Sequence, residues 1–211
     1  MKRSGTQQCK AAHNHLKKST KEYSQRLSEN INTTGALILS PRSDMGLCVF
    51  LARTVVGQQL SIQAARTIWD RVETKAKKRN TSVESILFPK FDRSLKSCGI
   101  SGSKRKAFYS ISEAIQSEAI QDSLLLNHTH EERSKQLTEI WGIGQWTADM
   151  TSIFYYGDPN IWPSTDGAVV RGIQIFSKGS IRKQKNIINV STPYRSYLAL
   201  YMWNAVDSGL L

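Results

Sequence analysis

The stretch "IWGIGQWTADM", Ile140–Met150, contains two glycines between two segments that are predicted to be helical. Gly142 and Gly144 stand two residues apart, between an apolar segment that ends at Trp141 and a second segment with helical spacing. Glycine permits the positive φ and the close backbone approach that a tight turn between helices requires. Since no proline interrupts the turn, N–H groups at the start of the second helix are left to bind a phosphate. The stretch predicts a phosphate-binding helical hairpin, or else an αα-hairpin whose glycines serve only close packing.

Helical signals recur along the rest of the chain, and no segment shows sustained alternation of period two. Ser61 precedes a run with apolar residues at helical spacing, which predicts a helix cap there. A further helix is expected to start at Thr165 or Asp166, and the last one at Thr192–Pro193. We therefore predict an all-α protein, with residues 1–12 as a loose basic tail.

The composition favours a polyanionic partner. The 211 residues include 29 Lys and Arg against 17 Asp and Glu, a formal net charge of +12. Nucleic acid is the first candidate partner for such a chain and an anionic membrane surface the second. No run of about 18 apolar residues predicts a membrane span, and the first ten residues have no apolar stretch behind them that would make a secretory signal.

Cysteine and histidine usage argues against a metal centre. Three widely spaced cysteines form no CxxC pair, which predicts a reducing compartment. The four histidines stand in no ligand set with a carboxylate or a cysteine, so we expect them at the surface; they are His13, His15, His128 and His130.

Several motifs together resemble the helix–hairpin–helix DNA glycosylase superfamily, which also contains endonuclease III. The hairpin stretch is similar to the superfamily's own hairpin. In chain order, the similar segments are "AAHNHLKKSTKEYSQRL", "VVGQQLSIQAARTIWDRV", "SCGISGSKRKAFYSISEAI", "LTEIWGIGQWTADM", "GDPNIWPSTDGAVVRG" and "TPYRSYLALYMW". The first and last of these resemble the 3-methyladenine DNA glycosylase II (AlkA-type) branch. The similarity runs from about Ala12 to Trp203 in the family's order.

The resemblance implies that Asp166 is the catalytic residue. From the residues alone, an Asp between "PST" and "GAVVRG" predicts a helix N-cap. The two roles are compatible, because a helix N-terminus favours the ionised carboxylate. An ionised carboxylate stabilises the oxocarbenium-like sugar and orients or deprotonates the attacking water. An N-alkylated purine is already cationic and leaves without strong acid assistance.

Trp146 bears on the type of reaction. Strand-cleaving members of the superfamily carry a lysine nucleophile two residues after the hairpin's second glycine, where this chain has Trp146. Because an indole cannot form a Schiff base, the resemblance implies a monofunctional glycosylase without lyase activity. The iron–sulfur cluster of the endonuclease III branch is excluded, since no cysteine follows Cys98.

Base recognition and DNA binding are assigned from the same resemblance. Extrusion of the base from the duplex requires a pocket for a flat, electron-poor ring. Trp203 matches the family's stacking tryptophan, and Trp146 and Met150 are expected to line the pocket, although core packing is the alternative for each tryptophan. The expected DNA-contacting residues are Gly142, Ile143, Gly144, Gln145 and Thr147 of the hairpin, and Gln58 and Gln59 of a wedge loop, whose alternative is a plain polar turn.

The resemblance also implies the organisation of the molecule. We expect a glycosylase domain over residues 13–211 without the β-rich N-terminal domain of the fuller AlkA-type enzymes. It should form two lobes, one over about residues 50–155 and one from both termini, with the active cleft between them. The resemblance implies no cofactor, although it allows a monovalent cation at the hairpin backbone. The expected partner is double-stranded DNA with a damaged base, and we expect an intracellular monomer that acts where DNA is.

Two classes of function follow. The first is an enzyme that excises alkylated purines, 3-methyladenine foremost, in base excision repair, or a glycosylase for hypoxanthine, uracil or 8-oxoguanine. The second is a helix–hairpin–helix module that binds damaged DNA without catalysis. Asp166 discriminates between them, because a binding module has no need of a carboxylate there.

Overall fold

The computed structural model describes residues 5–210, and these residues form helices and connecting turns with no strand. The chain divides into two compact units. Unit 1 comprises residues 1–41 and 152–211, and unit 2 comprises Arg42–Thr151. The lobe boundaries expected from the sequence were near residues 50 and 155. None of the described helices combines the length and the apolar composition needed to cross a bilayer.

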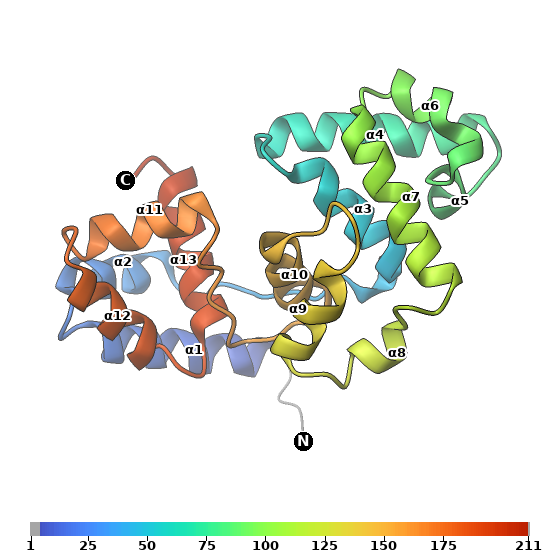
Figure 1. Cartoon of the computed structure of the whole chain (residues 1–211). Helices are drawn as coiled ribbons and strands as arrows, with labels where there is room; N and C mark the ends of the chain where they lie inside the picture. Colours follow the sequence, from blue (N-terminus) through green and yellow to red (C-terminus); the bar gives the residue numbers. More distant parts are fainter. Residues whose placement is uncertain (1–4, 211) are drawn as a thin grey trace. The chain divides into compact units, whose positions relative to one another are not determined.

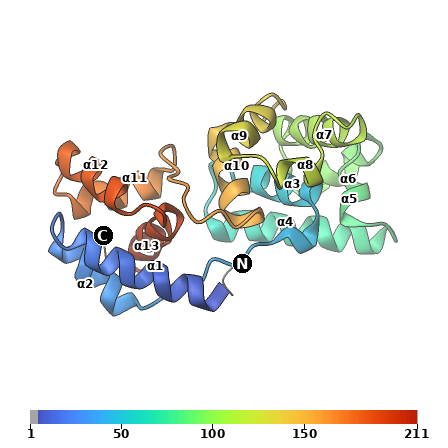
Figure 2. The ribbon, with the colours of Figure 1, turned by 90° about the horizontal axis from the view of Figure 1, so that it is seen from below.

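Unit 1 brings the two ends of the chain together (Figures 1 and 2). Helix α1 packs on α2 and on the late helices α12 and α13, and α11 packs along α13. The bounds are Gly5–Thr20 for α1, Gln25–Thr34 for α2, Gly167–Phe176 for α11, Ile181–Val190 for α12 and Arg195–Asp207 for α13. The blue and red segments of Figure 1 thus share one core although they are more than 100 residues apart in sequence.

The expected loose tail is wrong for the residues that can be checked. Residues 5–12 form the first turns of α1 rather than an irregular tail. Cys9 and Ala12 are buried, because their side chains lie on the apolar face of the helix, and Cys9 Sγ lies 3.8 Å from Tyr197 Oη in α13. Residues 1–4 lie outside the described range.

Unit 2 is built around the apolar helix α3, which packs against α4, α7 and α10. Helix α3 buries most of its length, since seven of its eleven residues are buried. The helical elements of unit 2 are η1 (Ser43–Met45), α3 (Leu47–Gly57), α4 (Ile62–Lys78), α5 (Val83–Ile86), η2 (Pro89–Phe91), α6 (Asp92–Ser97), α7 (Gly102–Gln116), α8 (Asp122–Leu125), α9 (His130–Thr138) and α10 (Gln145–Met150). A π-helical turn, Thr151–Tyr155, follows α10 and crosses into unit 1.

Most expected helix starts agree with the structure. Ser61 caps α4 by accepting the Ala64 N–H, and Asp166 caps α11 by accepting the Val169 N–H. The expected start at Thr192–Pro193 is wrong: this peptide bond is cis, and α13 begins two residues later at Arg195. Proline therefore ends the preceding turn there instead of occupying the first helical position.

Candidate active site

Asp166 is held in place by two hydrogen bonds to one carboxylate oxygen. Its Oδ1 accepts the backbone N–H of Val169 at 2.9 Å and the indole Nε1–H of Trp203 at 3.0 Å. The side chain is buried, with 8% of the residue exposed. Two donors aimed at one carboxylate oxygen fix the orientation of the side chain. The cap and the expected functional role thus coincide, and the structure brings together Asp166 and Trp203, which are 37 residues apart.

A buried serine anchors the loop that leads to Asp166. Ser196 in α13 accepts the Ile161 N–H at 2.9 Å and donates to the Asp158 carbonyl at 2.7 Å. Its own N–H donates to the Pro159 carbonyl at 3.0 Å. The loop that precedes Asp166 is therefore fixed to the helix that carries Trp203. Sequence reasoning missed Ser196, because nothing local distinguishes it from other serines at helix starts.

Close contact between α11 and α13 sets the distance from Asp166 to Trp203. A Cβ built on Gly172 would lie 3.0 Å from Met202 Cβ and 3.1 Å from its sulfur. Only glycine leaves the helices this close without displacement. Beside them the ring of Phe154 lies 5.6 Å from that of Trp203, centroid to centroid. Trp203 is half-buried, so part of its ring surface remains accessible for stacking.

In unit 2 the Gly-Ile-Gly hairpin joins α9 to α10. Gly142 has φ +87°, and a Cβ on it would lie 2.5 Å from Ala107 Cβ in α7. Gly144 is the N-cap residue of α10, with extended backbone and no atom within 4 Å of an added Cβ. Ile143 is buried and secures the turn, while both glycines are exposed. The first N–H groups of a helix have no intrahelical acceptor, so this end of α10 suits an anion.

Thr147 and Gln145, also expected to contact DNA, make side-chain hydrogen bonds within the protein. Thr147 is buried, and its Oγ1 accepts the side-chain amide of Gln58 at 3.0 Å. Gln145 donates from Nε2 to Asp149 Oδ1 at 2.7 Å. The carbonyls of Ile140 and Gly142 already accept hydrogen bonds, from the Ile143 N–H at 3.0 Å and from Gln58 at 3.1 Å. The expected cation at the hairpin stays a prediction.

The two expected wedge residues differ in what they contact. Gln58 points into unit 2 and binds the hairpin at Gly142 and Thr147. Gln59 is exposed and has φ +56°, a conformation that a non-glycine residue seldom adopts. Leu60 beside it is 40% exposed. Only Gln59 and Leu60 are therefore presented outward by this turn.

Trp146 and Met150, expected in the base pocket, lie on α10 in unit 2. Trp146 is half-buried, and its ring reaches to 4.0 Å from a Cβ built on Gly57 at the end of α3. Met150 is only 6% exposed. The role of both residues toward a base stays a prediction.

All four histidines are partly exposed, as expected for surface residues, but two of them also contact buried side chains. His130 Nε2 pairs with the buried carboxylate of Asp149 at 3.1 Å, directly behind the hairpin. In unit 1, His13 Nδ1 lies 3.0 Å from Tyr201 Oη, and burial lowers the pKa of His13. Over residues 5–210 no group of three or more His, Cys, Asp or Glu side chains could hold a metal ion.

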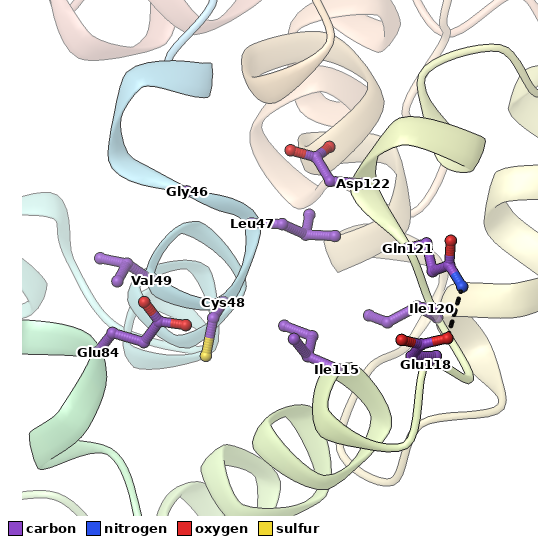
Figure 3. A pocket seen from close by; sticks show the side chains of 10 residues that line it. All are labelled: Gly46, Leu47, Cys48, Val49, Glu84, Ile115, Glu118, Ile120, Gln121 and Asp122. Atoms are coloured by element: carbon purple, nitrogen blue, oxygen red, sulfur yellow. Dashed lines mark hydrogen bonds between the residues drawn. The ribbon is translucent and has the colours of Figure 1, made fainter.

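One cavity of unit 2 lies apart from all of these residues. It has a volume of about 390 Å³ and an apolar wall with carboxylates at its rim (Figure 3). Cys48 is one of its lining residues, and burial together with Glu84 raises the pKa of this thiol to about 11. A thiol with so high a pKa is protonated and a poor nucleophile near neutral pH. The cavity therefore offers no second reaction centre of the cysteine type.

Comparison with curated proteins identifies glycosylases as relatives, although no family model matches the chain. The chain is 24% identical over 200 residues to the alkylbase DNA glycosidase-like protein mag2 of Schizosaccharomyces pombe, covering 92% of each chain. It is 27% identical over 158 residues to DNA-3-methyladenine glycosylase 1 of the same organism, covering 72% of this chain and 69% of that protein.

Solved structures share the fold. The DNA-3-methyladenine glycosidase of Bacillus halodurans matches with a TM-score of 0.73 and 26% identity, over 92% of this chain and 90% of that chain. The S. pombe 3-methyladenine DNA glycosylase Mag1, in complex with abasic DNA, matches with a TM-score of 0.77 and 24% identity, over 93% of this chain and 97% of that chain. The chain is therefore similar over most of its length to proteins named as alkylated-base DNA glycosylases, and it shares the fold of the helix–hairpin–helix DNA glycosylases.

Proposed function

We propose that this protein is a monofunctional DNA glycosylase that extrudes an alkylated purine, 3-methyladenine foremost, from double-stranded DNA and leaves an abasic site. The observation that carries the proposal is the buried carboxylate of Asp166, fixed by the Val169 N–H and the Trp203 indole. The relatives named as alkylated-base glycosylases support this lesion class. We infer that the protein acts as a monomer on DNA inside the cell.

The negative charge of the Asp166 carboxylate acts on the positive charge that develops on the sugar during the reaction. As the glycosidic bond breaks, the sugar acquires oxocarbenium character, which an ionised carboxylate stabilises. The same carboxylate orients the water that attacks the sugar and accepts its proton. A cationic alkylated base departs as a neutral ring, so no second carboxylate is required. The half-buried Trp203 offers an electron-rich ring face to that cationic base.

Hydrolysis without strand cleavage follows from Trp146. Its indole stands where a lyase would need an amine nucleophile, so no Schiff base with the sugar forms. Treatment of the protein with damaged DNA and borohydride should yield free base and an intact abasic strand, with no covalent protein–DNA adduct. Efficient trapping of an adduct contradicts the monofunctional assignment.

The decisive experiment substitutes Asp166 by Asn. Asn retains the shape and an oxygen acceptor for Val169 and Trp203, so the fold should persist. Loss of the charge should slow single-turnover release of 3-methyladenine on the order of a hundredfold or more. Affinity for a neutral abasic-site analogue should change far less. Asp207→Asn, on an exposed residue of the same unit, is the control and should release base at the wild-type rate.

The results also separate the enzyme from the alternative. If Asp166→Asn releases base as fast as the wild type, Asp166 is only a helix cap and the mechanism fails. If the wild type binds damaged DNA and releases no base of any kind, the protein is a damaged-DNA-binding module. Release of hypoxanthine, uracil or 8-oxoguanine instead of alkylated purines changes the lesion class but leaves the role of Asp166 in place.

A further inference from the structure

A lysine side chain holds the C-terminal end of α3. Lys104, in the first turn of α7, donates from Nζ to the Val56 carbonyl at 2.8 Å and to the Gln58 carbonyl at 3.1 Å. The last carbonyls of a helix lack intrahelical donors and carry partial negative charge, so an ammonium group is favourable there. Desolvation lowers the pKa of Lys104, and the two carbonyls compensate the buried charge. The Lys104 ammonium group is thus hydrogen-bonded to two backbone carbonyls.

The residue at that end of α3 binds the hairpin in turn. The Gln58 amide donates to the Gly142 carbonyl at 3.1 Å and to Thr147 Oγ1 at 3.0 Å. It thereby reaches both the turn itself and the first turn of α10. A chain of hydrogen bonds runs from α7 through the end of α3 to the hairpin, all inside unit 2.

The hydrogen bonds of Lys104 and Gln58 stabilise the unusual backbone conformation of the exposed residue Gln59. Gln59 keeps φ +56° between Gln58 and Leu60. A non-glycine residue persists in such a conformation only where its surroundings over-determine it. The bonds of Lys104 and Gln58 fix the backbone on the preceding side, and the Leu60 N–H donates to the Gly57 carbonyl at 3.2 Å. Gln59 and Leu60 are therefore presented in a preset direction.

We propose that Gln58 and Lys104 are positioning residues that join the 58–60 turn to the hairpin, so that the two segments meet the duplex as one preformed surface. The proposal rests on the proposed function and on two predictions from the sequence, that the hairpin binds a phosphate and that residues 58 and 59 form the wedge loop. Gln58 then acts through the hairpin and Gln59 rather than by contact with DNA. A preformed surface spares the ordering cost that two separate loops would incur on binding.

The test uses Gln58→Met and Lys104→Met, which keep the side-chain length and remove the donors. Gln116→Met and Lys96→Met, on exposed residues of unit 2, are matched controls. Affinity for a duplex with an abasic-site analogue should fall on the order of tenfold in the first pair relative to the controls, with wild-type helical content. Unchanged affinity overturns the proposal, whether or not the wild type releases base.

Base release gives a second readout that a general loss of stability would not reproduce. A 7-methylguanine paired in duplex must be extruded, whereas one opposite an abasic analogue is already unpaired and costs less to extrude. Both variants should slow release from the paired substrate several-fold more than from the unpaired one. Equal slowing on both substrates assigns a purely structural role and overturns the proposal. If the wild type releases no base, the proposed function is refuted, and the affinity measurement alone then decides whether Gln58 and Lys104 are positioning residues.

Salt dependence separates Lys104 from an ordinary phosphate contact. A lysine that neutralises a phosphate contributes about one unit to the slope of log affinity against log salt concentration. Because the Lys104 ammonium is bound to two carbonyls, Lys104→Met should weaken binding to undamaged duplex and leave the slope at its wild-type value. A slope reduced by about one would show a direct phosphate contact and overturn the positioning role of Lys104.

Discussion

At the scale of the residue, the hydrogen bond from Trp203 to Asp166 makes a prediction about orientation. Trp203→Phe keeps an aromatic ring and removes the Nε1–H that lies 3.0 Å from Oδ1. A hydrogen bond to a charged group contributes about 1.5–3 kcal/mol. Single-turnover base release should therefore slow by about tenfold or more. The midpoint of thermal unfolding should fall as well, because the same bond is lost from the folded state. An unchanged rate would show that the Val169 N–H alone suffices to hold the carboxylate.

The two hairpin glycines should differ in their tolerance of a methyl group. Gly142→Ala places Cβ 2.5 Å from Ala107 Cβ at φ +87°, so the hairpin must shift, at a cost of about 1–3 kcal/mol. Gly144→Ala meets no atom within 4 Å and keeps an ordinary φ of −104°. Thermal unfolding should show a lowered midpoint for Gly142→Ala and a nearly unchanged one for Gly144→Ala. Equal midpoints would contradict the close packing of the hairpin on α7.

Single residues also show where sequence reasoning stops. The role of Asp166 as a helix cap was predictable, because the N-cap preference is local and the backbone N–H that donates to its carboxylate lies only three residues ahead. The contacts of Gln58 were not, since Gly142 and Thr147 lie 84 and 89 residues away. The pair of the partly exposed His130 with the buried Asp149 was missed for a related reason: the two residues come together only where α9 packs on α10.

Among the helices, one half-exposed carboxylate of α6 bonds two side chains of α7. Asp92 Oδ1 accepts the Tyr109 hydroxyl at 2.6 Å and the Arg105 Nε–H at 2.7 Å, and these bonds lower the pKa of Asp92. A depressed folded-state pKa contributes stability above the unfolded-state value of about 3.9, and this stability is lost as the pH falls through the folded-state value.

Asp92→Asn should therefore lower the midpoint of thermal unfolding at pH 7, and the difference from the wild type should shrink as the pH is lowered below about 4. Asp44→Asn, on an exposed residue of η1, is the control and should show no such dependence. A difference between wild type and Asp92→Asn that stays constant from pH 7 to pH 3 would contradict the assigned ionic role.

Helix positions followed from the sequence better than helix boundaries. Caps such as Ser61 and Asp166 act on their own first turn, so their signal survives without tertiary structure. The start of α1 was not predicted, although residues 5–12 belong to a helix that packs on α2, α12 and α13. The π-helical turn after α10 likewise has no local sequence signal and accompanies the crossing from unit 2 to unit 1.

At the scale of the whole molecule, the positive charge is unevenly divided. Unit 2 contains 16 basic and 12 acidic residues, a formal charge of +4, and unit 1 carries the remaining +8 of the total +12. The hairpin and the 58–60 turn belong to unit 2, whereas Asp166 and Trp203 belong to unit 1. The residues proposed to bind DNA thus lie in unit 2, which is continuous in sequence, and those proposed to break the glycosidic bond lie in unit 1.

The fragment Arg42–Thr151 should consequently fold alone, since it is continuous, of ordinary domain size and has its own core around α3. We expect helical circular dichroism, cooperative thermal unfolding, and binding to undamaged duplex that is weaker and less salt-dependent than that of the whole chain, because most of the net charge is gone. It should release no base, because it lacks Asp166. Gly144→Pro in the fragment should remove an N–H at the hairpin and reduce this binding further. Base release by the fragment would refute the role of Asp166, and the absence of cooperative unfolding would show that unit 2 requires unit 1 to fold.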